Sequence, residues 1–171
     1  MSGAQLVSSS AQLLQLNVKL EEKYTTCLAD KTLRETFLWA VGHAEDSVVD
    51  NLKKVHRISE KQTWVWTVEG LCLAAKWEQL EKFGRSLKKS PPLIEACCKY
   101  GNVNLAGRFL DKLTAYEEQV KAFILLGRIV DAATLAAKKS DLNTLQQIRR
   151  RFAHDSEEWR QVSNIIQQVD R

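Results

Sequence analysis

The sequence predicts an all-α fold, an α-solenoid of about ten short helices stacked as hairpins. Helix breakers are scarce, with two prolines and seven glycines in 171 residues, and no Asn-Gly or Asp-Gly hairpin turn occurs. Hydrophobic residues make up 44% of the chain and charged residues 27%, which is the composition of a globular protein. At this length we expect a single domain, residues 1 to 171, with a sizeable core.

Hydrophobic periodicity and capping residues place the first helices. The first helix is expected to end near Tyr24, and Asp30 is expected to cap a second helix that ends at Gly42. A third helix is expected to begin at about Ala44. The apolar residues that define the first helix recur at helical spacing: Leu6, Leu13, Leu16 and Leu20.

Later helix starts are predicted from capping boxes, in which two residues three positions apart each accept the other's backbone N–H with their side chain. Three pairs of residues have the required spacing: Ser59 with Gln62, Thr114 with Glu117, and Asp155 with Glu158. Pro91 and Pro92 also fit a helix start, because the first helical turn needs no backbone N–H donor. The run "KWEQLEKF" before them is expected to bury Trp77, Leu80 and Phe83.

An internal repeat of 26 residues supports the stacking of hairpins. Small residues align at Ala75, Gly101 and Gly127, which we expect at helix ends. Apolar residues align two and eight positions later: Trp77, Val103 and Ile129, then Phe83, Phe109 and Leu135. The pattern predicts an α-solenoid. A chance match in a chain rich in Leu and Ala, or a compact non-repeating bundle, is the alternative.

The sequence predicts neither an enzyme nor a metal or cofactor site. Its three histidines, His43, His56 and His154, form no metal-binding motif and are expected at the surface or at helix ends. Cys97 and Cys98 diverge by about 100° on a helix, so one is expected in the core and the other partly exposed. Four cysteines without a C-x-x-C pattern, and no signal sequence, indicate a cytosolic protein with reduced thiols. No apolar run approaches the roughly 18 residues of a membrane span.

Two tryptophans in the segment "HRISEKQTWVWTVEG" indicate a candidate binding surface. Trp64 and Trp66 diverge by about 200° on a helix, so one is expected in the core and the other toward a neighbouring hairpin or a partner. Arg57, Lys61 and Gln62 lie beside them, and Trp and Arg are frequent among interface hot spots. The alternative is that both indoles belong to successive layers of the core.

The basic residues give a second candidate function, binding to nucleic acid or to an anionic membrane surface. The net charge is +4, and the excess of basic residues lies in the second half of the chain. The two densest clusters are Lys88-Lys89 and Arg149-Arg150-Arg151. Neither has aromatic residues interleaved on both sides, and cations at the end of a helix are stabilised by the helix dipole, so we expect no nucleic-acid partner.

Four segments together resemble the C-terminal region of vacuolar protein sorting subunit sixteen. They are "LLQLNVKLEEKY", "RISEKQTWVWTVEGLCLAAKWEQLEKF", "KKSPPLIEACCKYGN" and "EEQVKAFILLGRIVDAATLAAKKSDLNTL". They occur in order over about residues 11 to 148, and the W-E-x-L-E-K-F run with the K-K-S-P that follows is the most specific part. A shorter paralogue, the spermatogenesis-defective or VIPAR type, shares the Trp to Ser-Pro region and is the alternative within this class.

The resemblance implies the α-solenoid tail of a larger subunit in the class C core of the HOPS and CORVET membrane-tethering complexes. Family members use this tail to recruit the Sec/Munc-like (SM) subunit, which engages SNARE proteins at late endosomes, lysosomes or vacuoles. Other class C subunits and Rab-bearing membranes are the further partners that it implies. The protein would then be cytoplasmic and peripheral on these membranes.

The same resemblance assigns partner docking to residues 1 to 75 and further helical hairpins to residues 76 to 171. The implied partner-binding residues are Lys53, Arg57, Lys61, Gln62, Trp64 and Trp66. Two positions depart from the family pattern: Gln62 stands where a basic residue is expected before the aromatic pair, and Pro92 suggests a shortened turn.

Overall fold

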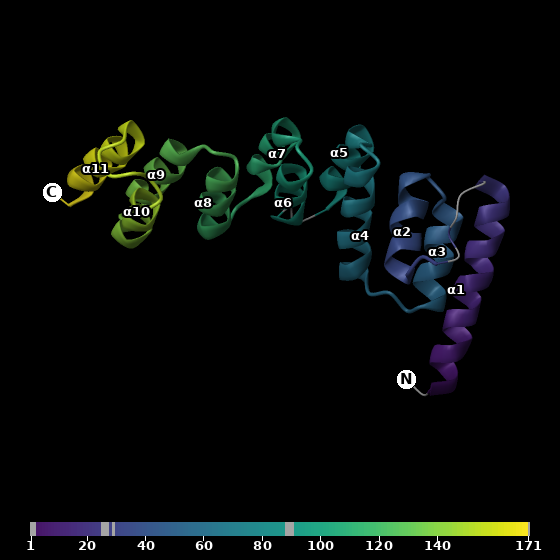
Figure 1. The fold of residues 1–171 in the computed structure, drawn as a ribbon. Helices are drawn as coiled ribbons and strands as arrows, with labels where there is room; N and C mark the ends of the chain where they lie inside the picture. Colours follow the sequence, from purple (N-terminus) through teal and green to yellow (C-terminus); the bar gives the residue numbers. More distant parts are fainter. Residues whose placement is uncertain (1–2, 25–27, 29, 88–90, 171) are drawn as a thin grey trace. The chain divides into compact units, whose positions relative to one another are not determined.

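The computed structural model describes residues 3–24, 28, 30–87 and 91–170. Within these ranges the chain forms eleven α-helices and one short 3-10 helix, with no strand (Figure 1). The predicted all-α fold is therefore confirmed. Successive helices are joined by short turns, as in a helical repeat protein.

The chain divides into two compact units, Met1–Phe83 and Gly84–Arg171. The boundary falls within α5, close to the predicted change between residues 75 and 76, and the predicted single domain stays a prediction. The helices of the first unit are α1 (Gly3–Tyr24), α2 (Leu33–Gly42), α3 (Asp46–Val55), α4 (Glu60–Leu73) and the start of α5 (Trp77–Ser86). Those of the second are α6 (Pro91–Lys99), α7 (Val103–Arg108), the 3-10 helix (Leu110–Lys112), α8 (Tyr116–Leu125), α9 (Ile129–Lys138), α10 (Leu142–Arg149) and α11 (Glu157–Val169).

In the first unit, α2 and α4 pack closely. The ring of Phe37 lies 5.4 Å from that of Trp66, and a Cβ added at Gly70 would lie 3.0 Å from the Cβ of Val41. Gly70 is therefore the small residue that this helix crossing requires. The fully buried side chains of the unit include Leu28, Phe37, Ala40, Leu52 and Leu80.

A buried polar pair connects α1 to this core. Thr36, which is fully buried, donates its hydroxyl hydrogen to Oδ1 of Asn17 over 3.0 Å. The amide nitrogen of Asn17 in turn donates to the carbonyl oxygen of Lys31 over 3.4 Å. Because each buried polar group has a partner, the pair fixes the rotation of α1 against α2 without an unsatisfied donor.

One core cluster of the second unit lies among α8 to α11 and is built largely from small and branched residues. Its buried members are Val120, Ala132, Ala133, Ala136, Leu145, Ile148 and Val162. At the start of the unit, Gly84 is buried against the ring of Phe109 and the side chain of Leu93. The predicted arrangement of the cysteines is confirmed, because Cys97 is fully buried and Cys98 is half-buried. Burial raises the pKa of the Cys98 thiol, so it stays protonated at neutral pH.

The 26-residue repeat corresponds to a repeated backbone turn. Ala75, Gly101 and Gly127 all have positive φ angles, at 53°, 86° and 72°. Each donates its N–H to a carbonyl three residues back, and the next residue donates to a carbonyl five residues back, which is the Schellman arrangement. The residues two positions later begin α5, α7 and α9. The repeat is therefore a recurring hairpin junction.

Several predicted helix starts were wrong by one or two residues. Thr32, not Asp30, caps α2, in a reciprocal capping box with Glu35. Ser156, not Asp155, caps α11, and the residue at the N-cap of α8 is Ala115, without a side-chain hydrogen bond. The Ser59 hydroxyl does accept the N–H of Gln62, as expected, and α6 does begin at Pro91. The third helix begins at Asp46, two residues after the predicted Ala44.

Candidate functional site

Five of the six predicted partner-binding residues surround the turn between α3 and α4. Lys53 lies in the last turn of α3, and Arg57 occupies the connecting turn with a φ of 50°. Lys61, Gln62 and Trp64 follow in the first two turns of α4. We call this group, Lys53, Arg57, Lys61, Gln62 and Trp64, the α3–α4 surface.

The sixth residue, Trp66, lies on a different side of α4. Its ring is tilted at 60° against the buried ring of Phe37, so Trp66 helps to hold α4 onto α2. Trp64 is half-buried and leaves the helix axis about 200° away from Trp66. The Phe37 contact shows that Trp66 packs on α2, whereas Trp64 is half-buried like Trp66 and the side to which it turns stays a prediction.

The α3–α4 surface is basic. Arg57 and Lys61 are exposed, and the Lys53 ammonium lies 3.6 Å from Asp50 in an exposed i,i+3 pair of little energetic weight. A 2.7 Å hydrogen bond joins Nδ1 of His56, at the end of α3, to the hydroxyl of Ser9. Burial lowers the pKa of His56, so this imidazole is neutral at physiological pH.

Val65 is a member of this surface that sequence reasoning missed. Its side chain is 40% exposed, although the residue stands between two tryptophans in an apolar stretch. Val65 lies four residues after Lys61 and Trp64 lies three after it, so both side chains are neighbours of Lys61 on the surface of α4. Its position four residues after the charged Lys61 was the feature of the sequence that could have predicted its exposure.

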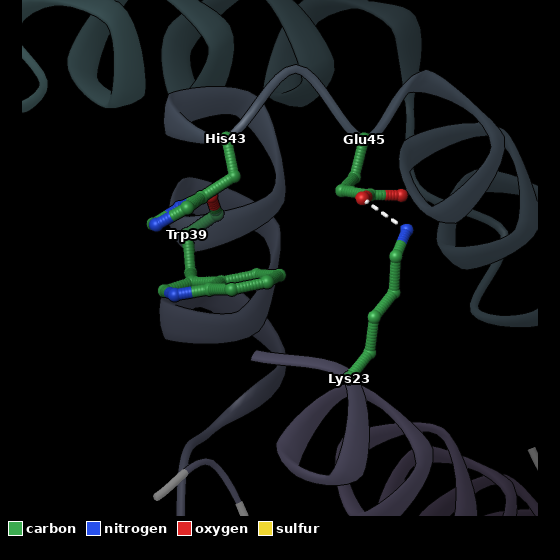
Figure 2. Close-up of polar contacts among 4 residues, drawn as sticks. All are labelled: Lys23, Trp39, His43 and Glu45. Carbon is green, nitrogen blue, oxygen red and sulfur yellow. Dashed lines mark hydrogen bonds and ion pairs between the residues drawn. The ribbon is translucent and has the colours of Figure 1, made fainter. Parts of the chain in front are cut away.

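A second aromatic cluster lies at the other end of α3, around the turn from α2 (Figure 2). The half-buried Trp39 ring stacks on the exposed His43 ring with centroids 4.1 Å apart and planes 20° apart. His43 Nδ1 also lies 2.8 Å from the carbonyl oxygen of Trp39. Beside them, the Lys23 ammonium lies 2.7 Å from a carboxylate oxygen of Glu45. The helix-end position predicted for His43 is confirmed, whereas Trp39 had no signal in the sequence.

In the described residues of the second unit, basic side chains gather at the end of α10 beside Trp159, whose ring also lies 4.5 Å from that of His154. The guanidinium of Arg149 lies 5.4 Å from the centre of the Trp159 ring, so it contacts a side chain of its own unit. Arg150 and Arg151 are exposed at the end of α10. The Lys88-Lys89 cluster lies outside the residues that the structure describes.

Neither a metal site nor a membrane span is found in the described part of the chain. Those residues contain no group of three His, Cys, Asp or Glu side chains that could hold a metal ion. Across the same ranges, no helix has the length and apolar character needed to cross a bilayer.

The fold and these surfaces define a helical repeat protein with a basic and aromatic surface on its first unit. The family model described as "Vps16, C-terminal region" matches residues 3–169, so the chain belongs to this family. The family predicted from the sequence is therefore confirmed.

Curated relatives from distant eukaryotes cover most of the chain. A vacuolar protein sorting-associated protein 16 homolog of Caenorhabditis elegans is 29% identical over 147 residues, which is 84% of this chain and 17% of the relative. The homolog of Dictyostelium discoideum is 23% identical over 88% of this chain and 18% of its own length. Vacuolar protein sorting-associated protein 16 of Saccharomyces cerevisiae is 23% identical over 94% of this chain and 22% of its own length. The chain thus spans about a fifth of the length of these relatives.

Proposed function

We propose that this chain is a scaffold region of a vacuolar protein sorting subunit, and that its first unit recruits the SM subunit of a tethering complex. The role is non-enzymatic. In this proposal the complex is of the HOPS or CORVET type and acts at late endosomes, lysosomes or vacuoles. The family match supports the sorting role, and the position of the α3–α4 surface supports the placement of the partner.

The observation that carries the placement is the side-chain distribution along α4. Trp66 is held against Phe37, so it stabilises the first unit. Trp64, Lys61 and Val65 lie on the outer side of the same helix, where an aromatic ring and an aliphatic chain stand beside a cation. Such a surface fits a partner that offers an apolar pocket with carboxylates at its rim.

Point variants of α4 test the proposal in the full-length subunit. Lys61→Glu and Trp64→Ala are expected to weaken co-purification with the SM subunit at least about tenfold, as for interface hot spots. Lys138→Glu makes the same change of charge at an exposed position of α9 and is the matched control. Binding by Trp64→Ala and Lys61→Glu at the level of this control would contradict the placement.

Trp66→Ala separates folding from recognition. Because this indole packs on Phe37, the variant is expected to lower the stability of the first unit by about 2–4 kcal/mol, measured by urea unfolding. Trp64→Ala is expected to lower it by less than half as much. A subunit that lacks residues 1 to 83 is expected to lose SM binding, and full binding by it would place the contact in the second unit.

A further inference from the structure

A hollow in the second unit lies between α8 and α10, and the function proposed above does not use it. Its volume is about 410 Å³. Both helices pack on α9, and the hydroxyl of Tyr116, at the start of α8, donates a 2.9 Å hydrogen bond to Asp141, the N-cap of α10. The two helices therefore begin at the same end of the hollow and line its two sides. We call this space the α8–α10 groove.

The α8–α10 groove has an apolar floor between two rows of exposed side chains. The buried Val120 and Ile148 form the floor with the half-buried Ile124. The exposed rows have the i,i+4 spacing of a helix surface: Glu117, Lys121 and Leu125 on the α8 side, and Gln147 and Arg151 on the α10 side. A groove between two such rows is the surface into which the side-chain ridge of another helix packs. The shape of the groove therefore fits an α-helix.

Leu125 shows that the rim of the groove is apolar at one point. This side chain ends α8 and is 45% exposed, although it is large and hydrophobic. It stands beside the apolar floor, so a partner that fills the groove would remove Leu125 from water together with Ile124. Contacts of this kind supply most of the affinity of a helix bound in a groove.

The two ends of the groove carry opposite charges. Glu117 and Asp141 lie where both helices begin, and Arg151 lies two residues beyond the end of α10. Between these ends, Lys121 is paired with Glu95 of α6, so its charge is balanced within the unit. The ends are separated by the length of α8, about 14 Å. This exceeds the screening length of about 8 Å at physiological salt, so the charges at the two ends do not neutralise each other.

The charge distribution determines the direction of a bound helix. The macrodipole of a helix gives its N-terminus partial positive charge and its C-terminus partial negative charge. The N-terminus of an occupant therefore fits beside Glu117 and Asp141, and its C-terminus fits beside Arg151. Basic side chains in the first turn and acidic ones in the last turn strengthen this fit. Most helices carry the reverse pattern, because it stabilises them in isolation, so the groove discriminates against them.

From these observations we infer that the α8–α10 groove binds an amphipathic α-helix of a partner protein, with cations in its first turn and carboxylates in its last turn. The bound helix is two to three turns long, as the length of the groove requires, and runs in the same direction as α8 and α10. The site lies in the second unit, so it is separate from the α3–α4 surface of the first unit.

Two synthetic helical peptides of identical composition test the inference with the full-length subunit. Both are stapled and carry leucines at i,i+4 spacing on one face. The first peptide has two lysines in its first turn and two glutamates in its last turn, and the second has these ends exchanged. Fluorescence anisotropy is expected to show at least about tenfold tighter binding of the first peptide. Equal affinities, tighter binding of the second peptide or no binding of either would overturn the inference.

Inversion of the charges of the groove shows whether the peptide binds there. The variant Glu117→Lys/Arg151→Glu exchanges the charges at two exposed positions and is expected to reverse the preference, so that the second peptide binds more tightly. Arg150→Glu makes a similar change at a neighbouring exposed residue outside the groove and is the matched control. It is expected to change either affinity less than about threefold. An unchanged preference in the double variant would refute the inference.

Leu125→Gln measures the apolar part of the contact. Because Leu125 is partly exposed, the variant is expected to keep the stability of the protein in urea while binding of the first peptide weakens at least about fivefold. Val130→Gln, at a residue that is 47% exposed on α9 and lies outside the groove, is expected to leave binding unchanged. Co-purification with the SM subunit is expected to be unchanged in both variants, which separates this site from SM recruitment. Full binding of the first peptide by Leu125→Gln would contradict the placement in the groove.

Discussion

Gly84 provides the sharpest test of the packing in the second unit. A Cβ added at this residue would lie 2.7 and 2.8 Å from two ring carbons of Phe109 and 3.0 Å from a methyl carbon of Leu93. Phe109 is only 2% exposed and Leu93 is fully buried, so neither side chain can move toward solvent. Overpacking of this kind costs about 1–3 kcal/mol, whereas alanine in a helix gains up to about 1 kcal/mol over glycine. We expect Gly84→Ala to destabilise the protein by about 1–2 kcal/mol.

Gly107 is the matched control, because it also lies in a helix and a Cβ there meets no atom within 4 Å. Gly107→Ala is therefore expected to stabilise the protein by about 0.5–1 kcal/mol. Urea unfolding followed by circular dichroism measures both changes. In a Phe109→Leu background the penalty of Gly84→Ala is expected to shrink, as a double-mutant cycle would show. Equal or greater stability of Gly84→Ala than of wild type would refute this account of the packing.

Two further predictions concern polar contacts of α2. Thr36→Val leaves the buried side-chain oxygen of Asn17 without its donor, so the free energy of unfolding measured in urea is expected to fall by about 1–2 kcal/mol. The same change at the exposed Thr134 is the control and is expected to be nearly neutral. Hydrogen bonds from the Thr32 backbone N–H and hydroxyl lower the pKa of Glu35 below its ordinary 4.5. The ionised Glu35 carboxylate therefore stabilises the folded chain fully above pH 4.5, and this stabilisation is lost as the pH falls through the lowered pKa. Glu35→Gln is expected to flatten this acid loss in melting curves recorded between about pH 5 and pH 3, and an unchanged slope would contradict it.

The hairpin repeat could be read from the sequence because the constraint on it is local. A residue with positive φ is favoured when it is small, and the next helix begins two residues later. Ala75, Gly101 and Gly127 are small, and α5, α7 and α9 begin two residues after them at Trp77, Val103 and Ile129, of which Val103 is 49% exposed. Both conditions act within a few residues, so spacing alone was enough.

The candidate site was predictable only in part, because its exposure depends on distant residues. The angle between Trp64 and Trp66 follows from helix geometry, but which of them turns inward is decided by Phe37, from another helix. The Trp39 and His43 rings stack at the end of α2, four residues apart, and no known sequence motif predicts this contact. The exposed position of Val65 likewise follows from how α4 packs rather than from its own apolar character.

The wrong start of the third helix has a physical cause in the junction before it. At five junctions the residue with positive φ is followed directly by the N-cap of the next helix, in the pairs Ala44–Glu45, Gly101–Asn102, Gly127–Arg128, Ser140–Asp141 and Asp155–Ser156. The N-cap residues of the first four pairs share ψ angles between 62° and 79°, and two of them, Glu45 and Arg128, make no side-chain capping bond. The end of one helix therefore fixes the start of the next through the backbone, and a side-chain cap adds stability without choosing the position. At Ser59, two residues after Arg57, the junction is one residue longer, and the side-chain cap that the sequence predicts there is present.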